Sequence, residues 1–87
     1  MDASRTREAL VHTRDLLTKI QDWDHAIIEP LMRELVGNLG LKAGQLFGAV
    51  RTAVSGRTAT PPLFEMMEVL GRDVSMKRIE RAIMLLS

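Results

Sequence analysis

The stretch that decides the fold class is residues 39–83, LGLKAGQLFGAVRTAVSGRTATPPLFEMMEVLGRDVSMKRIERAI. Its apolar residues recur three and four residues apart, as on one face of a helix, and no convincing length of it alternates with period two. One predicted helix covers Ala43–Val54, and another starts at Pro61 or Pro62. Between them, small, polar and proline residues cluster in the loop Ser55–Pro62. We therefore predict helices joined by short connections.

The first 40 residues predict two more helices. One runs from about Ser4, its N-terminal cap, to Ile20. The next is capped by Asp22 or Asp24 and ends before Gly40, a residue suited to a left-handed cap. These two helices precede the deciding stretch and bring the expected number to four.

A fifth helix is predicted after Gly71, with Asp73 or Ser75 as its cap. In each helix the apolar stripe is expected to face a common core, together with Trp23. The predicted core residues are Leu10, Thr13, Leu17 and Ile20, then Ile27, Leu31 and Leu35 with Ile28, Met32 and Leu39 beside them, then Leu46, Val50, Ala53 and Val54, then Leu63, Met66, Met67 and Leu70, and finally Met76, Ile79, Ile83 and Leu86.

Three residues inside the predicted helices are poor helix formers. Pro30 lacks an N–H group and clashes with the preceding turn, so it either kinks its helix or marks where the main helix starts. Gly44 and Gly48 each cost roughly 1 kcal/mol against alanine in a helix. Their spacing of four residues predicts that another backbone approaches this face closely.

Composition bounds the class of protein. The 87 residues are enough for one compact domain, 1–87, and 46% of them are hydrophobic and 26% charged, as in a folded chain. Only three aromatic residues are present, so the core is expected to be aliphatic. The sequence has no cysteine, which excludes disulfides and cysteine zinc sites. We predict an all-α small bundle of about five helices, placed in the cytoplasm and not in a membrane.

Charge is spread unevenly along the chain. Residues 1–41 carry five Lys/Arg against seven Asp/Glu, whereas residues 42–87 carry seven Lys/Arg against four Asp/Glu. The second half is therefore mildly basic, which is compatible with a phosphate backbone. The imbalance is much weaker than the basic stripe of a dedicated nucleic-acid binder.

The side chains that carry catalysis do not converge in this sequence. His12 and His25 have no partner at metal-ligand spacing on their own helices, and both are expected at the surface. Glu65 and Glu68 lie three residues apart on a face that we expect to be solvated. No glycine-rich phosphate loop is present. We expect no enzyme activity, no metal and no cofactor.

Short motifs in residues 39–83 follow a recognisable order. They are Leu-x-Leu-Lys-x-Gly-x-Leu at 39–46, Val-Arg-x-Ala-Val-Ser-Gly at 50–56, Pro-x-Leu-Phe-Glu at 61–65, Leu-Gly at 70–71 and Arg-Ile-x-Arg-Ala at 78–82. Their order and spacing resemble the C-terminal anticodon-binding domain of bacterial glutamyl-tRNA synthetases (glutamate–tRNA ligases). With Trp23, which also fits that family, the likeness extends over about residues 8–84.

The resemblance implies a helical bundle that grips the anticodon loop of glutamate tRNA. It implies that Arg51 faces the anticodon and that Thr60, Pro61 and Leu63 form the turn that meets the anticodon bases. Splayed, single-stranded bases can be read by backbone groups and small side chains, which such a turn offers. Gly56 and Arg57 start the same loop, where Gly56 suits a tight turn and Arg57 can reach phosphate.

Several alternatives stay open at this point. Arg51 can instead pair with Glu65 or Glu68, and the three cations on the last helix can form a solvated face or contact phosphates. These three are Lys77, Arg78 and Arg81. In a second reading the chain is a regulatory or protein-interaction module that acts on a synthetase or on another protein.

The sequence matches only the C-terminal part of the resembled family, and two explanations are open. Residues that match the catalytic half of the resembled family are absent from this sequence. Either an excised domain or a free-standing truncated paralogue of the synthetase tail would explain this.

Overall fold

The computed structural model describes residues 2–56 and 62–86, which form five α-helices and, within those ranges, no strand. The helices are α1 (Ala3–Thr18), α2 (His25–Leu39), α3 (Ala43–Ser55), α4 (Leu63–Leu70) and α5 (Arg72–Leu85). The predicted all-α bundle of about five helices is confirmed.

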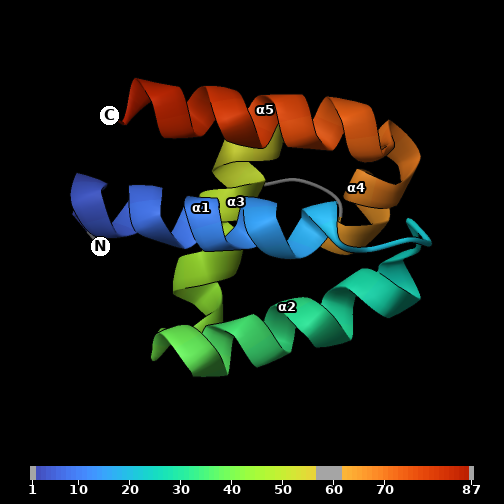
Figure 1. Ribbon diagram of the computed structural model, residues 1–87, viewed down its shortest axis with the longest axis horizontal. Helices are drawn as coiled ribbons and strands as arrows, with labels where there is room; N and C mark the ends of the chain where they lie inside the picture. Colours follow the sequence, from blue (N-terminus) through green and yellow to red (C-terminus); the bar gives the residue numbers. More distant parts are fainter. Residues whose placement is uncertain (1, 57–61, 87) are drawn as a thin grey trace.

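The two terminal helices, α1 and α5, pack against each other more extensively than any other pair of helices in the described chain. In Figure 1, α1 and α5 run side by side in opposite directions, so that both chain ends lie at the same end of the molecule. Helix α3 crosses behind them, and α2 lies on the other side of α1 from α5. The short α4 packs against both α2 and α5. The core lies where these helices meet.

Side-chain caps start the first two helices. The Asp2 carboxylate accepts the N–H of Arg5 at 2.8 Å, and the Asp24 carboxylate accepts the N–H of Ala26 at 2.8 Å. Each cap satisfies one of the N–H groups that a helix start leaves unbonded. The expectation for Asp24 is confirmed, whereas Ser4 is not the cap, because α1 begins one residue before it.

Glycines end three of the helices. Gly40, Gly56 and Gly71 have φ values of 66°, 72° and 86°, in the left-handed region that side chains disfavour. At Gly71 the chain turns so sharply that α5 begins at the next residue. Asp73 and Ser75 are therefore inside the helix, and the prediction that one of them caps it is wrong.

The expectations for Pro30 and the helical glycines have mixed outcomes. Helix α2 starts five residues before Pro30 and continues through it, so the main helix does not begin there. A Cβ at Gly44 or Gly48 would meet no described atom within 4 Å apart from the backbone of its own helical turns. The predicted close approach of another backbone is therefore wrong, and this face of α3 is open.

The core is aliphatic, as expected, with one aromatic pair at its edge. The buried hydrophobic residues are Ala9, Leu10, Leu17, Ile20, Ile28, Met32, Leu46, Val50, Val54, Leu63, Phe64, Met67, Ile79 and Ile83. On α2 the buried residues are Ile28 and Met32, while Ile27 is 39% exposed, so this helix is rotated relative to the predicted stripe. Phe64, which was not predicted in the core, packs edge-on against Phe47 with ring centres 5.1 Å apart.

A polar junction ties the connection between α1 and α2 to α4 and to the start of α5, at the end of the bundle opposite the chain ends (Figure 1). The Trp23 indole N–H donates to the carbonyl of Met67 at 2.7 Å. The Arg72 guanidinium lies 5.5 Å from the centre of the Trp23 ring and donates to the carbonyls of Ile20 and Gln21. Trp23 is thus half-buried against the core and also positions α4.

Among the described residues, none of the helices has both the length and the apolar character needed to span a membrane.

Candidate nucleic-acid interface

Arg51 lies on the last turns of α3 with its side chain half-buried. Its Nε is buried and has no hydrogen-bond partner among residues 2–56 and 62–86. Within the same residues, neither Glu65 nor Glu68 forms an ion pair with it. Leaving a buried donor unpaired costs about 1–3 kcal/mol. The Nε of Arg72 is unpaired in the same way, so it is the place of Arg51 beside the turn after α3, together with this unpaired donor, that makes it a candidate.

The turn that follows Arg51 is fixed by backbone and hydroxyl contacts. The Gly56 N–H donates to the carbonyl of Thr52 at 2.7 Å, and the Ser55 hydroxyl donates to the carbonyl of Arg51 at 2.6 Å. With φ at 72°, Gly56 sets the direction in which the chain leaves α3. Three predicted site residues, Arg57, Thr60 and Pro61, fall outside the described residues.

Leu63 begins α4 and is only 3% exposed. Its side chain therefore belongs to the core and can act on a ligand only by holding the start of the helix in place. Pro62 precedes it and supplies no side-chain cap within the described part of the chain. The first N–H groups of a helix lack intrahelical partners, so this end presents donors and the positive end of the helix dipole.

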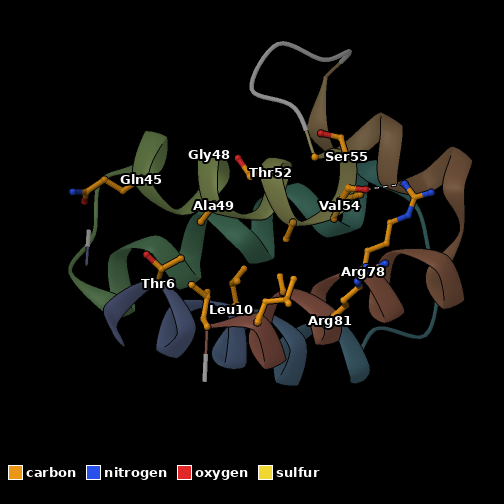
Figure 2. Close-up of a pocket in the computed structure, with 15 residues that line it drawn as sticks. Thr6, Leu10, Gln45, Gly48, Ala49, Thr52, Val54, Ser55, Arg78 and Arg81 are labelled. Carbon is orange, nitrogen blue, oxygen red and sulfur yellow. Dashed lines mark hydrogen bonds between the residues drawn. The ribbon is translucent and has the colours of Figure 1, made fainter. Parts of the chain in front are cut away.

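The cations of α5 do not act alike. Arg78 donates from Nη1 to the carbonyl of Val54 at 2.7 Å, which ties α5 to the end of α3 (Figure 2). Arg78 and Arg81 line one groove together with Gly56. Lys77 is exposed and does not line it. The structure thus brings Gly56 and two of the three predicted phosphate contacts to the same end of the bundle.

A second polar cluster, formed by Asp24, His25 and Glu68, joins the start of α2 to α4. The Glu68 carboxylate accepts the backbone N–H of His25 at 3.2 Å and lies 3.4 Å from the ring nitrogen Nδ1. The hydrogen bond to Glu68 raises the pKa of His25 above its usual 6.5, with smaller contributions from Asp24 and Glu65. Neighbouring carboxylates favour the charged imidazolium, which explains the direction.

The same three side chains offer ligand atoms within 4.8 Å of one another, the spacing of a metal site. Both carboxylates, however, already accept backbone N–H groups of α2. The positive end of the α2 dipole also points at the cluster and opposes a cation there. We assign it to capping of α2. Sequence reasoning missed this contact, because Glu68 is 43 residues from His25 and no local spacing joins them.

Comparison with known proteins identifies the family. Residues 1–83 match the family described as the anticodon binding domain. The chain belongs to this family.

Curated relatives agree with the assignment. The chain is 47% identical over its full length to a glutamate–tRNA ligase of Roseiflexus castenholzii, of which it covers 17%. It is 46% identical over 94% of its length to the glutamate–tRNA ligase of Roseiflexus sp. strain RS-1, and 46% identical over 93% of its length to that of Acidothermus cellulolyticus. It covers 16% of each of these two. The chain thus spans about one-sixth of the length of these relatives, and the resemblance seen in the sequence is confirmed.

In this family the candidate residues are expected to lie on one surface that faces the nucleic acid. The structure gathers Arg51, Gly56 and the start of α4 around the connection between α3 and α4. It leaves the Leu63 side chain inside the core. A signal for this was present in the sequence, since Leu63 opens the apolar stripe of α4.

Proposed function

We propose that this chain is a tRNA-binding module that contacts the anticodon loop of glutamate tRNA and has no catalytic centre of its own. Two things support the proposal: the relatives are glutamate–tRNA ligases, and Arg51 is an arginine with an unpaired, buried Nε beside the turn after α3. That unpaired donor is the observation on which the proposed site rests.

The chemistry of a single-stranded RNA loop suggests a different role for each site residue. Arg51 supplies a planar, charged donor to a base edge or a phosphate. Gly56 directs the chain, and Thr60, Pro61 and the backbone of Leu63 at the start of α4 offer small and backbone groups to the splayed bases. This arrangement fits a reader of unpaired bases and does not require a strongly basic surface.

Phosphate contacts come from neighbouring cations. We propose Arg57, Lys77, Arg78 and Arg81 for this role, since Arg78 keeps guanidinium nitrogens beyond the one that it donates to Val54. With so few cations the salt dependence is expected to be shallow, because each phosphate contact contributes roughly one unit to the logarithmic slope.

The test is an Arg51→Ala variant in fluorescence-anisotropy titrations with labelled glutamate tRNA. We expect affinity to fall by at least tenfold while the helical circular dichroism signal is unchanged. The matched control is Arg14→Ala, which removes the same charge from α1, where Arg14 already pairs with Asp15 at 3.3 Å. If both variants lose the same affinity, Arg51 contributes only through the net charge of the chain. If Arg51→Ala loses helicity, Arg51 is a structural residue.

A further inference from the structure

An open groove runs between α3 on one side and α1 and α5 on the other (Figure 2). Its volume is about 880 Å³. It follows α3 from Gln45 to Gly56, which corresponds to roughly 18 Å at the helical rise per residue. The groove is therefore about three helical turns long.

Small residues on α3 give the groove its width. The wall on that side is built by Gly48, Ala49, Thr52 and Ala53. As described above, a Cβ at Gly48 would meet no atom of the described chain within 4 Å. The opposite wall includes Leu85, which is 77% exposed. Leu85 and the small residues of α3 thus leave the groove open and lined mainly by apolar groups.

The charge at the groove has one sign. Of the described residues that line it, Arg78 and Arg81 are charged and none is acidic. Both arginines lie toward the Ser55 end of the groove (Figure 2). Arg78 is engaged with the carbonyl of Val54, whereas Arg81 forms no ion pair with any described residue. The complementary surface is an apolar stripe with a carboxylate at one end.

We propose that this groove binds an amphipathic α-helix of a partner protein, with small and medium apolar side chains against α3 and an acidic residue beside Arg81. A helix presents such a stripe at i, i+3, i+4 and i+7, and its length over three turns matches the groove. The groove shares Gly56, Arg78 and Arg81 with the surface proposed to contact tRNA, but its apolar wall along α3 lies outside that surface, and the inference does not require the tRNA-binding function.

Two other occupants fit the groove less well. No aromatic side chain lines it among the described residues, so unpaired bases would find no stacking platform there. A second copy docked groove to groove would add two more arginines to the interface and bring no carboxylate from its groove to Arg81. An acidic helix satisfies both the apolar wall and the unpaired cation.

The direct test uses two synthetic 14-residue peptides as probes, titrated into the isotope-labelled chain and followed by NMR. Both carry leucine and alanine at helical spacing, and they differ only in having glutamate or lysine at one end of the stripe. We expect the glutamate peptide to shift the resonances of Gly48, Ala49, Thr52 and Leu85, with at least fivefold higher affinity than the lysine peptide.

Variants of the groove sharpen the test. Gly48→Leu fills the open wall at a position where glycine is the poorer helix former, so the fold is retained while affinity falls at least tenfold. Gly48→Ala changes affinity less than threefold. Arg81→Glu reverses the preference toward the lysine peptide, whereas Lys77→Glu, the same charge change outside the groove, leaves it in place.

Three results would overturn the proposal. These are equal affinity for both peptides, unchanged binding by Gly48→Leu, and no shift in the groove with either peptide. If glutamate tRNA instead shifts Gly48, Ala49 and Leu85 while the peptides do not, the groove is a nucleic-acid surface.

Discussion

Arg72 holds together the junction at one end of the bundle. Its guanidinium bonds the carbonyls of Ile20 and Gln21 and stacks on Trp23, which in turn bonds the carbonyl of Met67. A planar guanidinium presents its face to the ring and its edge N–H groups to the carbonyls, whereas an ammonium group is a point charge with no face to stack. One side chain of α5 therefore fixes the connection from α1 to α2 and, through Trp23, the end of α4.

We expect Arg72→Ala to lower the free energy of unfolding by about 2–4 kcal/mol, as the sum of lost charged hydrogen bonds and the cation–π contact. Arg72→Lys should recover less than half of that loss. Urea denaturation measures both. Lys77→Ala on the exposed face of α5 serves as the control and should change stability by no more than about 0.5 kcal/mol. A loss equal to that of the control would show that the junction contributes nothing.

His25 makes stability depend on pH. Glu68 raises the pKa of His25 in the folded chain, and protonation is thus favoured by folding. The stabilisation is complete below the unfolded pKa of about 6.5 and is lost as pH rises through the higher folded pKa. We expect the melting temperature to decline over this window, to a smaller extent at high salt because the pair is partly exposed.

The variant Glu68→Gln checks the cause. It removes the first-named source of the pKa shift, and its melting temperature should vary less with pH between 6 and 8 than that of the native chain. An NMR titration of the His25 ring should show its pKa falling toward the ordinary value. An unchanged ring pKa in Glu68→Gln would contradict this account.

At the scale of the element, helical periodicity predicted all five helices, because apolar residues must repeat every three to four positions to share one face. It did not predict which of two adjacent stripes of α2 faces inward. Ile27 and Ile28 are equivalent in the sequence, and only the packing of α1, α3 and α4 places Ile28 in the core. For the same reason Gly44 and Gly48 were assigned to a close contact that the bundle does not make.

Helix α4 joins stability to the proposed site. Leu63 is buried at the start of the helix whose free N–H groups we assign to the anticodon bases. We expect Leu63→Ala to cost about 2–4 kcal/mol of stability and also to weaken tRNA binding, since the helix start loses its anchor. Thermal melting and anisotropy titration measure the two effects.

The control on the same helix is Val69→Ala. Val69 is 85% exposed, and removing its methyl groups should alter stability by no more than about 0.5 kcal/mol. If Leu63→Ala melts at the same temperature as Val69→Ala, the burial of Leu63 does not stabilise α4.

At the scale of the whole molecule, the two proposed surfaces adjoin each other at Gly56 and Arg78. The connection between α3 and α4 carries the proposed anticodon contacts, and the groove between α3, α1 and α5 carries the proposed partner site. The order of motifs in the sequence was enough to predict the family, whereas the role of Arg51 as a site residue stays a prediction. Local sequence patterns could not predict three features that join residues far apart in the chain: the groove, the His25–Glu68 contact and the Arg72 junction.

The central claim is that the turn after α3 reads the anticodon loop. The most direct measurement is an NMR titration of the labelled chain with glutamate tRNA and with a non-cognate tRNA, at low and at physiological salt. We predict shifts confined to Arg51, residues 56–64 and the proposed phosphate contacts on α5, larger for glutamate tRNA than for the other. The absence of any shift at low salt, or equal shifts with both tRNAs spread over the surface, would contradict it.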